Sequence, residues 1–205
     1  MTGAATSSDA GLCETRDLPL SSPALHFVRA SSAEARARAA AFRREVFLDR
    51  RGVVFDERLD AERDLNGHVF LLSDGSTPLA TARVLPFPSR LSPLLELGSG
   101  FGCEDADAEV GRIAAVRSPG AARASLALLT LGARWLLERS HHRNYIAYCH
   151  PKLVELYRLL GAADLGVSCI VPGRADAHRI VAGTFAAAAR LGAQFLGQLD
   201  GAVQR

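Results

Sequence analysis

One predicted strand, residues 108–116, carries two charged side chains among apolar ones. It reads Ala-Glu-Val-Gly-Arg-Ile-Ala-Ala-Val, so Glu109 and Arg112 stand three positions apart. Residues three apart on a strand point to opposite faces of the sheet. One charge must therefore point into a packed face unless a bulge or bend re-aims it, and sheets bend in this way beside active sites. The alternative is an ordinary cross-strand ion pair at the margin of the sheet.

The remaining apolar patterns predict the order of helices and strands. We expect strands at residues 26–30, 69–73, 78–85, 108–116, 145–149, 166–171 and 178–184. We expect a loop at residues 86–107, and helices at residues 33–48, 122–139, 152–160 and from residue 186 onward. The last helix is expected to dock on the sheet in preference to another subunit. This order predicts an α/β (α+β) fold with one mixed central sheet and helices on both faces.

Domain organisation follows from length and pattern. Residues 1–24 show no sustained apolar period, so we expect a flexible N-terminal tail. A single domain is expected over residues 25–205, because about 100–200 residues is the usual size of one domain.

Composition and charge exclude several classes of function. The chain has 24 Lys and Arg against 22 Asp and Glu, a formal charge of +2, without a block of like charges, which speaks against a nucleic-acid binder. The four cysteines lack zinc or disulfide spacing, so we expect reduced thiols and no metal. The longest apolar run, residues 124–137, is too short for a membrane span. Without a signal-peptide pattern, the sequence predicts a cytoplasmic protein.

An acidic segment precedes the strand at residues 69–73. It contains Asp56, Glu57, Asp60, Glu62 and Asp64. Such a density of acids is typical of a solvated loop. The functional alternative is that one or two of these carboxylates are partly buried and take a proton from an amine substrate, or hold that amine.

Two further side chains are candidates because of their apolar surroundings. Arg83 is the single charge in an apolar strand, so we expect a carboxylate partner, either as a plain structural pair or as a pair lining a substrate pocket. Tyr157 lies on the helix predicted after a buried strand. Half-buried packing is the simpler interpretation of this tyrosine. The functional one is that its phenol donates a proton to a departing thiolate.

Five short motifs occur in a characteristic order over residues 26–165. They are Arg-Arg-Glu-Val-Phe at 43–47, the acids at 60–64 before His68, Thr-Ala-Arg-Val-Leu-Pro at 81–86, Glu-Val-Gly-Arg at 109–112 with Ala-Val at 115–116, and Leu-Tyr-Arg-Leu-Leu-Gly at 156–161. Their order and spacing resemble the GCN5-related N-acyltransferase (GNAT) superfamily. Within it, they are similar to the branch of acyl-homoserine-lactone synthases and long-chain N-acyl amino acid synthases.

The resemblance implies a splayed sheet that grips an acyl thioester, whose carbonyl carbon an amine attacks. The splay would open between the strand ending at Val116 and the strand at residues 145–149. Free backbone amides at Ala115 and Val116 would hold the thioester carbonyl. Arg117 and Arg123 would add positive charge for the phosphate of a pantetheine arm, at the N-terminus of the following helix.

The resemblance also indicates the donor and the acceptor. Residues 117–123, Arg-Ser-Pro-Gly-Ala-Ala-Arg, depart from the glycine-rich loop of acetyl-CoA-using members, and Pro119 removes one amide donor. We therefore expect an acyl thioester co-substrate on acyl carrier protein in preference to coenzyme A, with no permanently bound cofactor. Residues 52–55, Gly-Val-Val-Phe, lack the tryptophan expected of lactone synthases. An amino acid or another primary amine is the expected acceptor.

By the same resemblance, the catalytic residues would be Glu109, Asp64 and Tyr157. Glu109, or an acid from the segment containing Asp60 and Asp64, would draw off the amine proton directly or through water. Tyr157 would protonate the leaving thiolate.

The resemblance places substrate binding on Arg43, Phe47, Asp60, Arg83 and Arg112. Arg83 or Arg43 would hold the carboxylate of the acceptor. Arg112 would pair with Glu109 and orient it.

Two other functions stay open at the level of sequence. The first is an acetyl-CoA-dependent N-acetyltransferase of a small amine or peptide. The second is a non-catalytic member of the fold that binds a ligand or assembles with other proteins. The chain is expected to be a monomer or a homodimer.

Overall fold

The computed structural model describes residues 25–97, 105–116, 121–171 and 176–203. The expected tail at residues 1–24 and the expected cofactor-binding residue Arg117 lie outside the described residues. No helix within the described parts of the chain is long and apolar enough to cross a membrane.

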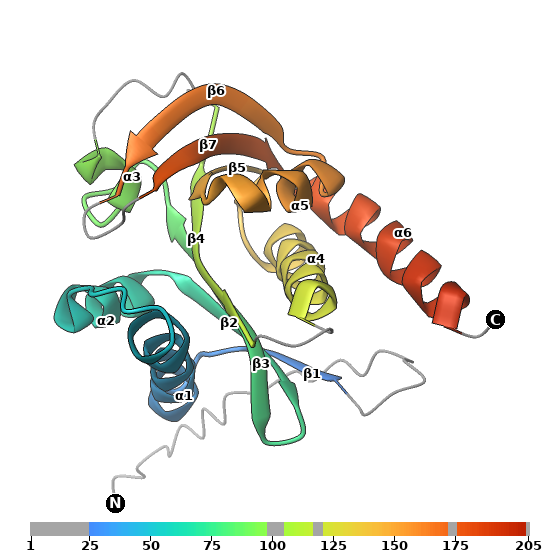
Figure 1. Ribbon diagram of the computed structural model, residues 1–205, viewed down its shortest axis with the longest axis horizontal. Coiled ribbons are helices and arrows are strands. Elements are labelled where there is room, and N and C mark those ends of the chain that lie inside the picture. The colour runs from blue at the N-terminus through green and yellow to red at the C-terminus, as the bar shows by residue number, and fades with distance from the viewer. Residues whose placement is uncertain (1–24, 98–104, 117–120, 172–175, 204–205) are drawn as a thin grey trace, which may run out of the picture.

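Seven strands form one sheet in the order β1-β2-β3-β4-β5-β7-β6 (Figure 1). Their bounds are β1 Leu25–Arg29, β2 His68–Asp74, β3 Thr77–Pro86, β4 Ala108–Ala115, β5 Asn144–Cys149, β6 Ala163–Ile170 and β7 Ala177–Thr184. All neighbouring pairs are antiparallel except β4 and β5, which run parallel. The predicted mixed sheet is confirmed.

The helices are α1 Ala33–Arg44, which continues into the π-helical turn η1 Glu45–Asp49, then α2 Glu57–Asn66, α3 Pro93–Glu96, α4 Ala121–Arg139, η2 Pro151–Leu153, α5 Val154–Leu159 and α6 Phe185–Val203. The expected loop at residues 86–107 thus contains one short helix. The interpretation of the acidic segment as a solvated loop is wrong, because it folds as α2. Asp56 begins that helix by accepting the amide hydrogens of Arg58 and Leu59.

Helices cover both faces of the sheet, as predicted. On β2, Val69 and Leu71 pack in one cluster with Ala39 of α1. The alternating residues Phe70 and Leu72 belong to the main core, which includes the apolar face of α4. Because successive side chains of a strand point to opposite faces, α1 and α4 lie on opposite sides of the sheet.

The C-terminal helix α6 docks within the chain on the α4 side of the sheet, as expected (Figure 1). Phe185 and Ala188 belong to the core cluster that contains α4. The two helices come so close that a Cβ atom at Gly192 would lie 2.0 Å from Oγ1 of Thr130. A glycine is therefore required at this crossing.

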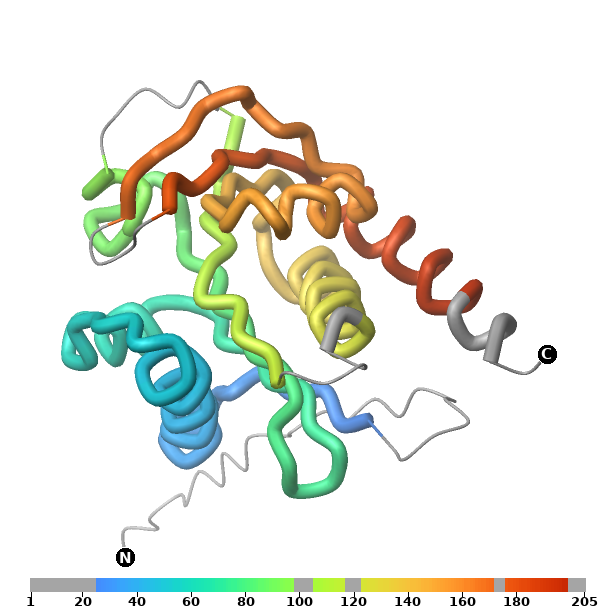
Figure 2. Tube along the Cα trace, viewed as in Figure 1, coloured from blue at the N-terminus to red at the C-terminus, as the bar shows by residue number. Residues whose placement is uncertain are grey.

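The β4–β5 pair opens into a splay. Its register runs only through Ala108↔Tyr145, Glu109↔Ile146 and Val110↔Ala147, although β4 continues to Ala115 and β5 to Cys149. Figure 2 shows the consequence: the blue and teal helices α1 and α2 lie on one side of the yellow-green β4, and the orange to red strands β6 and β7 lie on the other. The expected position of the splay is confirmed.

A β-bulge re-aims β4 at the splay. Thr81 of β3 pairs with Ala114, whereas Arg83, two residues on, pairs with Gly111, three residues back. The extra residue falls at Arg112, whose φ is 52°. In a regular strand Glu109 and Arg112 would point to opposite faces of the sheet. The bulge interrupts this alternation between the two residues, so neither charge is forced into an apolar face.

A histidine cluster lies beside the C-terminal end of α4, with His68 half-buried and His142 buried. The ring of His68 lies 5.1 Å from the Trp135 ring and 5.8 Å from the His142 ring. Burial, together with the nearby charge of Arg29, lowers the pKa of His68 to about 4. The pKa of His142 is also lowered, chiefly by burial.

This cluster predicts acid-sensitive stability. In the unfolded chain His68 has a pKa near 6.5 and in the folded protein near 4, so protons bind the unfolded state preferentially between these values. The contribution of His68 to the free energy of unfolding is expected to be constant above about pH 6.5 and to fall as the pH drops from 6.5 toward 4. His68→Phe should flatten this slope in urea titrations, whereas His26→Phe, on β1, should not. Equal slopes for all three proteins would contradict the assignment.

Candidate active site

Three connected cavities run through the splay. The throat is lined by β4 residues 111–113, by residues 148–150 and by Phe47, Tyr157 and His178 among others. A larger cavity of about 790 Å³, the basic mouth, shares Ile113, Tyr157 and His178 with the throat. A third cavity of about 580 Å³, the apolar mouth, shares Arg112 and Tyr148 with it. The shared lining residues place the three cavities next to one another at the splay.

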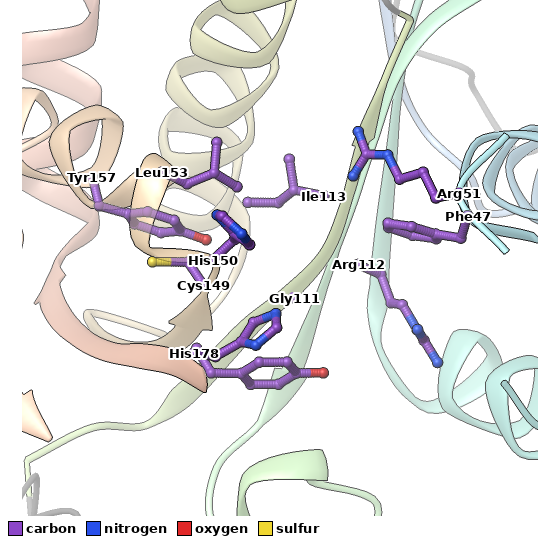
Figure 3. A pocket seen from close by; sticks show the side chains of 11 residues that line it. Phe47, Arg51, Gly111, Arg112, Ile113, Cys149, His150, Leu153, Tyr157 and His178 are labelled. Atoms are coloured by element: carbon purple, nitrogen blue, oxygen red, sulfur yellow. The ribbon is translucent and has the colours of Figure 1, made fainter. Parts of the chain in front are cut away.

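The throat brings together side chains from the two halves of the molecule. In Figure 3, Phe47, Arg51 and Arg112 approach from the side of η1 and β4, and His150, Tyr157 and His178 from the side of β5, α5 and β7. The π-helical turn η1 carries Phe47, and such turns are frequent at functional sites.

The basic mouth contains three cationic side chains, Arg50, Arg51 and Lys152. It reaches the first turns of α4, because Ser125 also lines it. The expected cofactor-binding residue Arg123 lies on α4, two positions before Ser125. The N-terminus of a helix and cationic side chains both favour an anion here.

The apolar mouth has a different lining. Its wall includes Val53, Val54, Phe55, Leu59, Pro93, Leu97 and Val171. Charged groups at this mouth are Arg112, Arg63, Asp56 and Glu96. The two mouths are therefore suited to different ligands.

Behind the apolar mouth lies a buried ion cluster of three arginines, Arg43, Arg83 and Arg112, around Asp60 and Asp64. Arg83 Nη1 donates to Asp60 Oδ1 at 2.9 Å and to Asp64 Oδ1 at 3.1 Å. Arg43 donates to Asp64, and Arg112 Nε donates to Asp60 Oδ1 at 2.8 Å. Burial alone would raise the pKa of Asp60, but Arg83, Arg112 and Arg43 outweigh it and hold that pKa below its usual value.

This cluster confirms that Arg83 has carboxylate partners and changes the expected roles. Arg43 is 0% exposed and Arg83 2%, and neither lines the three cavities. Their expected role of holding the acceptor carboxylate does not fit this burial. Asp60 and Asp64 are likewise engaged with arginines, and ion-paired carboxylates are poor proton acceptors.

Arg112 is the member of the cluster that reaches the cavities. Its guanidinium lies 4.7 Å from the ring centroid of Phe55 and 5.9 Å from that of Phe47, and it lines both the throat and the apolar mouth. The expected pairing of Arg112 with Glu109 is wrong, because the bulge directs Arg112 toward Asp60.

Glu109 is enclosed on the same strand. It is 2% exposed, accepts a hydrogen bond from the Ser92 hydroxyl, and accepts the Leu94 amide hydrogen at 3.3 Å. Burial raises the pKa of Glu109 to about 7, although the hydrogen bonds from Ser92 and Leu94 act in the opposite direction. The side chain does not line any of the three cavities.

Comparison with known proteins identifies the fold. Neither a family model nor a curated protein sequence matches this chain. Among solved structures, FeeM, an N-acyl amino acid synthase from uncultured soil microbes, is 18% identical with a TM-score of 0.64, covering 79% of this chain and 90% of its own. The AHL synthase LasI is 18% identical with a TM-score of 0.57, covering 78% and 89%. The chain has the GNAT fold.

The ribosomal-protein-S18-alanine N-acetyltransferase from Escherichia coli shares the GNAT fold at a TM-score of 0.56. It is 13% identical, and the match covers 78% of this chain and 94% of that one. At such identities the likeness concerns the fold alone. The chemistry of the site must be argued from the residues of this chain.

One backbone amide of the GNAT splay faces the opening. The Val116 amide donates to the Leu79 carbonyl at 3.0 Å, so the expectation that it is free is wrong. Ala115 pairs with Ala80 in the next register position. Because backbone groups alternate in direction along an antiparallel ladder, the Ala115 amide points away from β3 and toward the splay.

Tyr157 lies where the resemblance placed it, in the wall between the throat and the basic mouth. It is 3% exposed, and burial raises its pKa well above the ordinary value, so the phenol keeps its proton at neutral pH. Figure 3 shows the hydroxyl directed into the throat.

Among the residues of the throat that sequence reasoning missed are Arg51, Tyr148, His150 and His178. A signal existed for two of them. Tyr148 and His150 stand at the end of the predicted buried strand at 145–149, and the splay was expected to open along that strand. His178, at the start of β7, had no comparable signal.

The ion cluster predicts a structural role for Arg83. Arg83→Ala leaves two buried carboxylates short of a partner, and should lower the free energy of unfolding by about 3–5 kcal/mol. The matched control is Arg44→Ala, which breaks an exposed pair with Glu57 and should cost about 1 kcal/mol or less. Urea denaturation measures both, and equal small losses would contradict the structural role.

Proposed function

We propose that this protein is an N-acyltransferase that moves an acyl group from a thioester to the amine of an amino acid. One observation carries this proposal: two cavities adjoin the throat at the splay, one with a cationic lining and the other largely apolar, with Arg112 and Arg63 as its arginines. The two substrates would then meet in the throat from opposite faces.

The donor thioester would bind from the basic mouth. Arg50, Arg51 and Lys152 complement the phosphate of a pantetheine arm, and the start of α4 adds its dipole. An acyl carrier protein presents one such phosphate, so we propose it as donor, with acyl-CoA as the alternative source of the same arm.

At the basic mouth, beside the throat, the Ala115 amide would hold the thioester carbonyl oxygen. A donor aimed at this oxygen stabilises the charge that develops on it when the amine attacks. Tyr157 would donate a hydrogen to the departing sulfur, because its raised pKa keeps the phenol protonated.

The acceptor would enter from the apolar mouth. Arg112 uses Nε for Asp60, and its guanidinium lines the apolar mouth, so we propose Arg112 in place of Arg83 or Arg43 as the group that binds the acceptor carboxylate. Phe47 and Phe55 hold this guanidinium by ring contacts.

The amine must lose protons during the reaction, and Glu109 is one group that would accept a proton. A pKa of about 7 lets this carboxyl exchange a proton at neutral pH. Because Ser92 and Leu94 enclose it, Glu109 would act through water and not by direct contact with the amine.

Mass spectrometry of extracts from bacteria expressing this protein tests the proposal. New fatty-acyl amides should accumulate with the parent chain and fall about 100-fold with Glu109→Gln, since proton transfer by a positioned side chain contributes about 10²–10⁴-fold. The masses would identify acyl chain and acceptor together. Short acetylated products would instead identify an acetyl-CoA enzyme, and identical extracts with and without the protein would refute acyl transfer.

Arg112 provides a separate prediction about the acceptor. Arg112→Gln should raise the KM for an amino acid acceptor about 10-fold or more, because a hydrogen bond to a charged group contributes about 1.5–3 kcal/mol. The KM for the corresponding amino acid amide, which lacks the carboxylate, should change much less. Steady-state kinetics with both acceptors measures this, and an equal change for the two would exclude carboxylate binding by Arg112.

A further inference from the structure

Two imidazoles of the throat have no role in the mechanism above. His150 follows β5 directly and His178 lies near the start of β7, and both line the throat and the basic mouth. Figure 3 shows both rings directed into the space between the two halves of the molecule. The ring centroids of the two histidines are 6.1 Å apart.

His178 is on the face of the sheet from which the acceptor would enter. Side chains two apart on a strand share a face, so His178 points to the same side as Ile180. Ile180 belongs to the cluster that contains Leu94 and Ile146, with Tyr148 packed against it. Tyr148 lines the apolar mouth and its ring contacts that of His178, while His178 itself lines the throat and the basic mouth.

Hydrogen bonding assigns the proton of the His178 ring. Nδ1 lies 3.0 Å from the backbone carbonyl oxygen of Asp176, and a carbonyl oxygen only accepts, so Nδ1 carries the hydrogen. In the neutral ring the basic nitrogen is then Nε2. A histidine that accepts a proton at Nε2 is oriented in this way, by a hydrogen bond from Nδ1 to a backbone carbonyl.

His150 has the opposite assignment. Its Nδ1 accepts the amide hydrogen of Lys152 at 3.2 Å, so Nε2 carries the proton and donates to Asp176 Oδ2 at 3.2 Å. Asp176 therefore holds both rings, one through its backbone and one through its side chain. The nitrogen of His150 that lacks a proton accepts the Lys152 amide hydrogen, whereas the nitrogen of His178 that faces Asp176 is the one that carries the proton.

We propose that His178 is the residue that takes the proton of the acceptor amine directly, in the acyl transfer proposed above. Glu109 is enclosed by Ser92 and Leu94 and lines none of the three cavities, whereas His178 forms part of the wall where the two substrates meet. The inference rests on the proposed function and adds a catalytic residue that the sequence motifs do not contain.

The step balances as follows. Nε2 of His178 accepts one proton of the acceptor ammonium, and the nitrogen lone pair so released forms the new C–N bond to the thioester carbon. The C–S bond then breaks, and the amide nitrogen loses a second proton as the sulfur leaves as a thiol. The imidazolium returns its proton to solvent, so that one proton is released for each amide formed.

The groups around this ring come from every element packed against it. They are Tyr148 of β5, Cys149 and His150 at its end, Lys152 of η2, Tyr157 of α5, Cys169 of β6, Asp176 before β7 and Arg51 after η1. The two cations disfavour an imidazolium and the Asp176 carboxylate favours it.

The variant His178→Asn tests the proposal. The asparagine amide can replace Nδ1–H as donor to the Asp176 carbonyl but supplies no basic nitrogen. The matched control is His141→Asn, an exposed histidine outside the three cavities. Purified proteins are assayed with a dodecanoyl thioester of acyl carrier protein, and of coenzyme A, with the acceptor identified by mass spectrometry.

At neutral pH, His178→Asn should lower kcat about 100-fold and change the donor KM less than threefold, and His141→Asn should match the parent. The deficit should shrink as the pH approaches the pKa of the acceptor amine, because solvent then removes the proton. A purely structural role of His178 predicts a deficit that does not depend on pH in this way.

The outcomes separate the two proposals. If the parent transfers acyl groups and His178→Asn stays within threefold of it, or keeps a pH-independent deficit, the role of His178 is overturned and the proposed function stands. If the parent transfers no acyl group from either donor, the proposed function fails and the role of His178 fails with it. Activity in the parent with a deficit that disappears at high pH supports both.

Discussion

The buried ion cluster around Asp60 and Asp64 is the interaction on which the site depends. Charges removed from water are tolerated only when they are paired, and here the pairing joins α1 through Arg43, β3 through Arg83 and the bulge of β4 through Arg112. Helix α2, which carries both carboxylates, is thereby held against the sheet. The wall of the apolar mouth and the direction of Arg112 are both consequences of this neutralisation.

The splay converts that rigid half into a site. Three pairs of residues join β4 and β5, and beyond Val110 and Ala147 the strands diverge. At the splay the sheet is open, so its two faces are not separated from each other there. The ion cluster supports one wall, and Asp176 with its two histidines supports the other. Reactive groups thus stand on rigid elements on either side of a narrow gap.

The sequence predicted the sheet and the need of Arg83 for a carboxylate, because apolar period and the cost of a lone buried charge are local properties. The splay was expected from the resemblance of the motifs to the GNAT superfamily. It did not predict α2, since the inward side of that helix is formed by Asp60, Arg63 and Asp64, and a pattern search recognises apolar residues. The pairing of Arg112 depended on a bulge whose geometry the sequence could not specify. The position of His178 depends on the register between β7 and β5 and on the backbone carbonyl of Asp176. Neither of these can be recognised from the pattern of side chains in the sequence.

The opposite placement of the two mouths has a consequence for the order of events. Neither substrate needs to leave before the other binds, because each has its own entrance, so under the proposed function a ternary complex forms by either route. The thiol in the throat, Cys149, is not a relay for the acyl group, since burial raises its pKa to about 11 and keeps it protonated. Initial-rate plots should accordingly intersect, as they do for direct transfer, and not run parallel as they do when an acyl-enzyme is formed.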